Sequence, residues 1–108
     1  MKKNNVKKIN PIKDDDNVKY VLQLYVNGSK PSSARAIKNA IKLCEEYLDE
    51  AYKLQVIDLH EHPLLAIEKD IIATPTLVIQ KLPGPLQKLI GDLSSIDHVL
   101  VGLNLKKL

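Results

Sequence analysis

The chain has 108 residues, a length that favours a single domain, and 44% of them are hydrophobic, as in an ordinary globular protein. Its one cysteine, Cys44, cannot form an internal disulfide, which excludes a disulfide-held scaffold. Residues 1–16 carry five lysines and three aspartates, which is +2 of the formal +3 charge, so the remaining chain lacks the basic excess of a nucleic-acid-binding domain.

The amino-terminal segment is polar, charged and interrupted by Pro11, which predicts a flexible leader over residues 1–18 and one folded domain over 19–108. The segment lacks the apolar stretch of a signal peptide. No window of the sequence reaches the roughly 18 to 20 apolar residues that cross a bilayer. With a lone cysteine, which suits a reducing compartment, these features predict a cytoplasmic protein with no membrane partner and no nucleic-acid partner.

The first ordered elements are predicted to be a buried strand and a long helix. Residues 19–26 (KYVLQLYV) form a nearly continuous apolar run, typical of a central strand covered on both faces. After a loop, apolar residues recur at three- and four-residue spacing up to about Tyr52, which predicts an amphipathic helix. Ser32 or Ser33 is expected to cap its first turn.

The rest of the chain is predicted to complete an α/β fold. A second strand over 54–59 makes a βαβ unit with the first strand and the helix, which implies parallel strands. The later predicted elements are a short helix over 64–70, strands over 77–82 and 86–90 around a Pro83-Gly84-Pro85 turn, and a last helix opened by a capping box from Ser94 to Asp97. The order β-α-β-α-β-β-α is that of a thioredoxin-like fold.

The loop after the first predicted strand argues against redox chemistry. A thioredoxin-like redox enzyme needs a Cys-x-x-Cys pair there, where the amino end of the helix stabilises the attacking thiolate. Residues 27–33 (NGSKPSS) contain no sulfur, and Cys44 falls on the apolar face of the helix. Burial would raise the pKa of its thiol, so a core role is favoured. A thiol-redox enzyme of glutathione or peroxide chemistry is the less favoured alternative.

No other residue pattern predicts a catalytic, cofactor or metal site. The two imidazoles of His60-Glu61-His62 suit zinc, but no third ligand is evident nearby, which favours a solvated loop. Ser32, Ser33, Asp58 and His98 are the residue types of a nucleophile triad, yet the strained G-x-S-x-G turn is absent. Phosphate-loop and dinucleotide-binding glycine patterns are absent too. The protein is therefore not expected to be an enzyme.

Several segments together resemble the KaiB family over about residues 19–105. They are YVLQLYVNG (20–28), Pro31, SARA (33–36), VID (56–58), ATPTL (73–77), the Leu82-Pro83-x-Pro85 turn, IGDLS (90–94) and VLVGL (99–103). The combination of ATPTL, the proline turn and IGDLS is specific. The family is also similar to the sensor domain at the front of the histidine kinase SasA.

The resemblance implies a non-enzymatic regulator that binds the ring-shaped ATPase KaiC in a circadian, timing or stress-response circuit. Members capture KaiA, compete with SasA and switch between two folds. One form self-associates as a dimer or tetramer, and the other is a thioredoxin-like monomer that binds KaiC. The resemblance places Gly91 and Asp92 in the fold-switch region and implies a cis peptide bond before Pro75. Glycine and aspartate both disfavour regular structure, so such a boundary can shift at low cost.

The resemblance also implies a partner-binding surface, and several of its residues depart from the family pattern. Its residues are Gln23, Arg35, Lys53, Gln55, Glu61, Gln87 and Lys88. The family has lysines where this chain has Gln23, Gln55 and Glu61, and an arginine pair where it has Gln87 and Lys88. Gly84 interrupts a triple proline, and Lys106-Lys107-Leu108 replaces an acidic tail. A less basic surface binds an acidic partner less strongly. A homo-oligomeric thioredoxin-fold adaptor with a different protein partner is the alternative.

Overall fold

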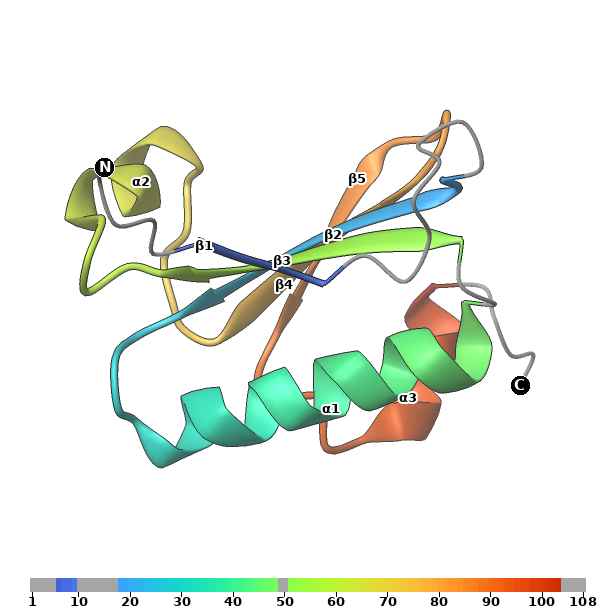
Figure 1. Cartoon of the computed structure of the whole chain (residues 1–108), viewed down its shortest axis with the longest axis horizontal. Coiled ribbons are helices and arrows are strands. Elements are labelled where there is room, and N and C mark those ends of the chain that lie inside the picture. Colours follow the sequence, from blue (N-terminus) through green and yellow to red (C-terminus); the bar gives the residue numbers. More distant parts are fainter. Residues whose placement is uncertain (1–5, 10–17, 49–50, 104–108) are drawn as a thin grey trace.

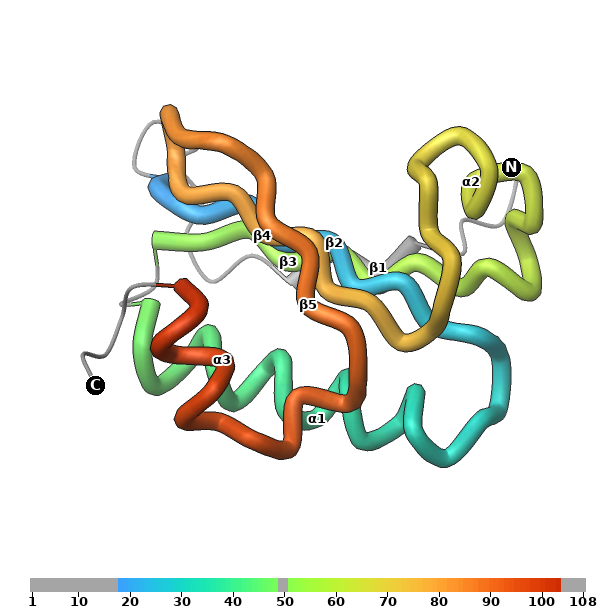
Figure 2. The backbone as a smooth tube through the Cα atoms, turned by 180° about the vertical axis from the view of Figure 1, so that it is seen from behind, coloured from blue at the N-terminus to red at the C-terminus, as the bar shows by residue number. Residues whose placement is uncertain are grey.

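The computed structural model describes residues 6–9, 18–48 and 51–103 of the chain. They form one five-stranded sheet in the order β1-β3-β2-β4-β5, with α1 and α3 together on one face and α2 at one end of the other (Figures 1 and 2). The elements are β1 (Val6–Ile9), β2 (Tyr20–Val26), α1 (Pro31–Tyr47), β3 (Tyr52–Asp58), α2 (Pro63–Glu68), β4 (Thr76–Lys81), β5 (Leu86–Ile90) and α3 (Ile96–Gly102).

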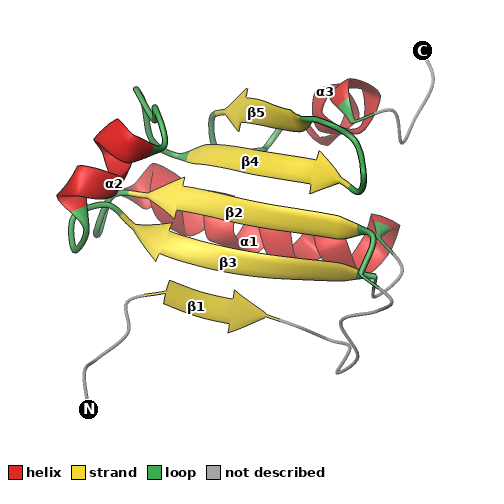
Figure 3. Ribbon diagram, turned by 90° about the horizontal axis from the view of Figure 1, so that it is seen from above, coloured by secondary structure: helices red, strands yellow, loops and turns green. Residues whose placement is uncertain are grey.

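The strand pairing agrees with the predicted βαβ unit. β2 and β3 are parallel and adjacent, joined by α1, while β4 pairs antiparallel with β2 and β5 antiparallel with β4 (Figure 3). From β2 onward the elements follow the predicted order β-α-β-α-β-β-α. The carboxyl ends of β2 and β3 and the amino end of β4 therefore meet at the end of the sheet that carries α2.

β1 is an element that the sequence did not predict. Val6–Ile9 lies within the segment predicted to be a flexible leader, yet it pairs antiparallel with β3. A strand at the edge of a sheet offers backbone N–H and C=O groups, and a short extended segment can pair with them whatever its side chains are. The other residues of the predicted leader, apart from Val18, lie outside the described residues.

Both predicted helix caps are wrong. α1 begins at Pro31, whose fixed backbone angle suits a first turn, and Lys30 precedes it without a side-chain capping bond. The Ser33 hydroxyl instead accepts a hydrogen bond from the Asn27 backbone N–H at 3.1 Å. α1 also ends at Tyr47, so Tyr52, which was expected in the helix, is a buried residue of β3.

The last helix differs from its prediction in the same way. α3 begins at Ile96, and Ser95 before it makes no side-chain capping bond. The Ser94 backbone N–H donates to the Asp92 carboxylate at 3.1 Å. A carboxylate two residues upstream thus holds the Ser94 amide in a turn, and Ser95 rather than Ser94 directly precedes the helix.

Two apolar clusters fill the two faces of the sheet. The larger lies between the sheet and α1 with α3, and it includes the fully buried Leu22, Leu24 and Leu54. The smaller lies on the opposite face, where Leu65 and Ala66 of α2 pack against it. Its buried residues are Tyr25, Ile57, Leu59, Ile71 and Val78. Each fully buried leucine stabilises the fold by about 1.5–3 kcal/mol, so the face under α1 and α3 contributes most of the core.

Candidate protein-interaction surface

The loop that would hold a redox centre is organised by backbone hydrogen bonds. The Asp58 carboxylate at the end of β3 accepts the backbone N–H groups of Gly28 and His60, both at 2.9 Å. Gly28 has a φ of +51°, a conformation that side chains disfavour. These bonds join the β2–α1 loop to the β3–α2 loop. Asp58 therefore has a structural role here.

Cys44 is a core residue, as predicted. Its side chain is fully buried under the sheet. Burial, assisted by the negative charge of Glu45, raises the pKa of the Cys44 thiol to about 12. The thiol is therefore protonated at neutral pH, whereas disulfide exchange and nucleophilic attack need the thiolate.

The other predicted chemical motifs do not assemble into a site. Within the described part of the chain, no three histidine, cysteine or acidic residues are grouped so that they could hold a metal ion. His60 is exposed beside Gly28. His98 is exposed on α3, whereas Asp58 and Ser33 bond to backbone groups of the loops described above. None of the helices in the described ranges has both the length and the apolar character that spanning a membrane demands.

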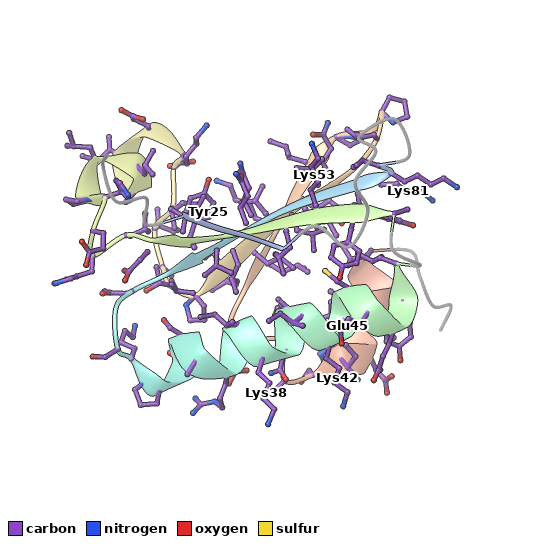
Figure 4. The ribbon with its side chains drawn as sticks, in the orientation of Figure 1. Tyr25, Lys38, Lys42, Glu45, Lys53 and Lys81 are labelled. Carbon is purple, nitrogen blue, oxygen red and sulfur yellow. The ribbon has the colours of Figure 1, made fainter. Side chains whose placement is uncertain are left out.

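Four of the predicted partner-binding residues share the sheet face that α1 and α3 leave open. Gln55, Gln23 and Lys88 lie in one row across the sheet, with Val78 between the last two. Lys53 lies on the same face, on the side of β3 away from α1 (Figure 4). These positions alternate with the buried leucines of β2 and β3, which is why strand periodicity could place them together.

Short hydrogen bonds fix the centre of this open face. The Gln23 side-chain amide donates to the Gln55 side-chain carbonyl at 3.3 Å, and the Tyr25 hydroxyl donates to the Gln23 side-chain oxygen at 3.1 Å. Burial raises the pKa of Tyr25, so its hydroxyl stays a neutral donor. At the β5 side, the Lys88 ammonium donates to the backbone carbonyls of Lys69 and Asp70, at 3.4 and 2.8 Å. The row of Gln55, Gln23 and Lys88 is thus a polar, hydrogen-bonded strip across a face that also carries the smaller apolar cluster.

The other three predicted partner-binding residues lie elsewhere. Arg35 is on α1, Glu61 is exposed in the loop before α2, and Gln87 pairs with Ile79 on the helix-covered face. Gln87 lines a hollow of about 200 Å³ at the end of the β4–β5 hairpin. The seven residues therefore do not form one continuous surface.

The structure also exposes three large apolar side chains in and just after α2, which were not predicted to be exposed. Leu64 and Ile67 of α2 and the following Ile72 are 69%, 79% and 85% exposed, and α2 contains no buried residue. Ile72 lines a hollow of about 380 Å³ together with Pro63 and Ala66. The sequence feature that indicates this exposure is the unbroken run of apolar residues over 64–67. A six-residue helix cannot bury all of them on one face. We call Leu64, Ile67 and Ile72 the α2 patch.

The turn after β5 contains the two residues that the resemblance places in the fold-switch region. Gly91 has a φ of +122° and Leu93 a φ of +65°, so left-handed residues flank Asp92 on both sides. The Asp92 carboxylate accepts a 2.8 Å hydrogen bond from Arg35, and its backbone carbonyl accepts one of 2.8 Å from Asn39. The Arg35 bond, followed by the bonds from Ser94, lowers the pKa of Asp92 to about 2. Two residues of α1 thus hold this turn.

The Thr74–Pro75 peptide bond, at the entrance to β4, is cis, as is the Leu82–Pro83 bond. The Lys30 ammonium donates to the Thr74 carbonyl at 3.4 Å, and the Gly91 backbone N–H donates to the Pro75 carbonyl at 2.9 Å. The segment around Pro75 therefore lies between the amino end of α1 and the turn after β5.

Comparisons with known proteins agree with this architecture. The family model described as the KaiB domain matches residues 23–105. The circadian clock oscillator protein KaiB of Microcystis aeruginosa is 50% identical over 86 residues, which cover 80% of this chain and 82% of that protein. The chain therefore covers most of this relative.

Solved structures identify the fold independently of the KaiB sequences. The N-terminal domain of Synechococcus elongatus SasA is 26% identical and superposes with a TM-score of 0.62, covering 84% of this chain and 89% of that domain. Oxidised mitochondrial thioredoxin 3 of Saccharomyces cerevisiae, 21% identical, gives a TM-score of 0.61 with 82% of both chains covered, which shows the fold alone. The fold is thioredoxin-like, and the chain belongs to the KaiB family.

Proposed function

We propose that this chain is a non-enzymatic, KaiB-like regulator that binds a KaiC-type ATPase in a circadian, timing or stress-response circuit. The observation that carries the proposal is the α2 patch, an exposed apolar surface on a chain half-identical to a circadian clock oscillator protein. The buried, protonated Cys44 favours a binding role over thiol chemistry.

The α2 patch is suited to protein binding because most of the surface of each of its side chains is exposed. Leu64 and Ile67 are three residues apart and so lie on the same side of α2. Burying one such side chain in an interface contributes up to about 1.5–3 kcal/mol. Apolar residues exposed together on a small domain commonly mark a docking surface. We therefore assign the centre of the interface to the α2 patch.

The polar face next to the patch is proposed to form the rim of the same interface. Lys53 and Lys88 supply its positive charge, while Gln23 and Gln55 are neutral where the family pattern has lysines. With fewer charges, the long-range attraction to an acidic partner is weaker, and salt has less attraction to screen. We expect binding to depend on ionic strength only weakly.

We further propose that the Gly91–Asp92 turn sets the balance between this form and a self-associating dimer or tetramer. The turn has left-handed backbone at Gly91 and at Leu93, and this conformation is unfavourable for leucine. Hydrogen bonds from Arg35 and Asn39 to Asp92 hold the turn in place. Unfavourable backbone angles lower the stability of this conformation. The free-energy difference between it and an alternative conformation of the segment is therefore small. The alternative form would pair residues from about 54 onward in a new register.

The test is a titration of the chain with the host's KaiC homologue in its ATP and ADP states. We expect binding in at least one state and a loss of tenfold or more for Ile67→Asp, equivalent to about 1.4 kcal/mol. Lys38→Asp is the matched control, because Lys38 is exposed on α1 and points away from the sheet (Figure 4). Absence of binding in every nucleotide state would refute the partner while leaving the fold intact.

A further inference from the structure

α2 is a short helix that is attached to the rest of the domain at its two ends. It contains no buried residue, and the partly buried Leu65 and Ala66 pack against the smaller apolar cluster. At its amino end, the His62 backbone N–H donates to the Asp58 carbonyl at 3.1 Å. At its carboxyl end, the contact comes from Lys88 of β5. A helix of six residues is not stable by itself in water, so its position depends on these attachments.

The carboxyl end of α2 contains a backbone conformation that is unfavourable for its residue. Asp70 has a φ of +57°. Its backbone N–H donates to the Ile67 carbonyl at 3.2 Å, and the Ile71 backbone N–H donates to the Ala66 carbonyl at 2.8 Å. This pair of bonds is a common way for a helix to end, and the left-handed position in it is usually glycine. Because aspartate is less stable than glycine in that conformation, the helix end benefits from a further contact.

Lys88 provides that contact from the neighbouring sheet. Its ammonium donates to the Asp70 carbonyl at 2.8 Å and to the Lys69 carbonyl at 3.4 Å, and it lies 3.8 Å from the Asp70 carboxylate. The last carbonyls of a helix lack partners within the helix and carry partial negative charge, so a cation beside them is stabilising. Lys88 itself pairs with Val78 in the β4–β5 ladder, which fixes its backbone. The lysine therefore ties the end of α2 to β5.

The tie acts on a residue that lies between two members of the α2 patch. Ile67 precedes Asp70 by three residues, and Ile72 follows it by two. A change in the backbone of Asp70 therefore moves the two isoleucines relative to each other. We propose that Lys88 is a positioning residue, which caps α2 from β5 and holds the α2 patch in the arrangement that docks on the partner. The docking part rests on the proposed function, because it takes the α2 patch as the binding surface.

This role differs from direct contact with the partner, which the family resemblance implied for Lys88. The Lys88 side chain is 40% exposed, and its ammonium bonds to carbonyls of its own chain. When a binding-competent arrangement is only partly populated, the apparent affinity falls in proportion to its population. Loss of Lys88 should therefore weaken binding by loosening α2. A change that restores α2 without restoring the positive charge should restore binding.

The first test needs no partner and uses the full chain with Lys88→Met, which keeps an unbranched side chain and removes its donors. In the free protein, amide hydrogen exchange at residues 69–71 should be about tenfold faster, because a charge-assisted hydrogen bond at the helix end is lost. Lys81→Met, at the end of β4 away from α2, is the matched control and should not change this exchange (Figure 4). Retained protection of the β2 amides verifies the fold. Unchanged exchange at residues 69–71 in Lys88→Met would overturn the tie.

The second test compares affinities for the KaiC homologue. Lys88→Met should bind about twofold more weakly or worse, and adding Asp70→Gly, which suits the left-handed position, should restore both slow exchange and binding. Asp70→Ala removes the same negative charge but keeps a side chain at that position, so it should restore neither.

Two outcomes of this comparison would count against the docking role. If Asp70→Gly restored slow exchange but not binding, Lys88 would contact the partner directly, and the positioning role would be overturned. If the unmodified chain bound the KaiC homologue in no nucleotide state, the docking role would fail with the proposed function. The exchange result would still decide whether Lys88 holds α2.

Discussion

The two halves of the folded chain use their apolar residues differently. In the first half, β2, α1 and β3 bury theirs, and Tyr47 is the one exposed large hydrophobic side chain among the described residues there. In the second half, from α2 to α3, six such side chains are exposed: Leu64, Ile67, Ile72, Leu82, Leu86 and Ile90. Exposed side chains of this kind do not contribute to the core, so they are available for contacts with a partner.

Backbone conformation separates the halves in the same way. The non-glycine residues with left-handed backbone, Asp70 and Leu93, both belong to the second half, whereas each half has one such glycine, Gly28 and Gly91. The second half thus carries conformational strain as well as exposed apolar surface. We infer that the first half is the scaffold and that the second half provides the interaction surface and the capacity to rearrange. The following predictions test this division, beginning with the largest effect.

A core substitution in the first half should destabilise the protein far more than the same substitution on β5. Leu54→Ala removes a fully buried side chain and should lower the free energy of unfolding by about 2–5 kcal/mol. Leu86→Ala, the matched control, should change it by less than about 0.5 kcal/mol, because Leu86 is exposed. Urea unfolding followed by circular dichroism measures both. Equal losses would contradict the division.

Substitutions in the turn after β5 should shift the population of oligomers. No atom lies within 4 Å of a Cβ at Gly91, so Gly91→Ala is opposed only by its φ of +122°, at a cost of about 1 kcal/mol or more to this form. Asp92→Arg replaces the Arg35 bond with a like-charge pair. Both variants should alter the size-exclusion profile. Profiles identical to that of the unmodified chain would refute the proposed switch.

Acidification should weaken the same turn in a defined pH range. The pKa of Asp92 is about 2, below the roughly 3.9 of an unfolded aspartate, so its contribution to stability is complete above about pH 4. It is lost as the pH falls from about 4 to 2. NMR titration of the carboxyl group measures this, and Arg35→Ala should raise the pKa. An unchanged value in Arg35→Ala would show that Arg35 is not the main cause.

The sequence alone predicts the order of the elements because their signals are local. The apolar run of β2 and the three- and four-residue spacing of α1 each depend on neighbouring residues, and both elements are present. The predicted caps failed because the Ser33 hydroxyl bonds to the Asn27 backbone N–H and because α3 begins after Ser95, one residue later than a cap at Ser94 requires. β1 was missed because its pairing depends on a distant strand, β3.

The candidate surface was predictable to a similar extent. Strand alternation places Gln23 and Gln55 on one face, and the structure joins them by a hydrogen bond. The resemblance pointed to Asp92, but its partner Arg35 lies 57 residues away, a pairing that no local pattern reveals. The α2 patch was not singled out, since a short helix gives too few turns to show which residues stay exposed.

A substitution that leaves stability nearly unchanged but weakens binding would show that the second half provides an interaction surface. Ile72→Ser removes an 85% exposed side chain, so the free energy of unfolding should change by less than about 0.5 kcal/mol. Affinity for the KaiC homologue should nevertheless fall, because the apolar contact with the partner is lost. Ile79→Ser, at a buried position of β4, is the contrasting control and should destabilise the fold itself. If Ile72→Ser lowered stability as much as Ile79→Ser, Ile72 would be part of the core, and the α2 patch would not be a free surface.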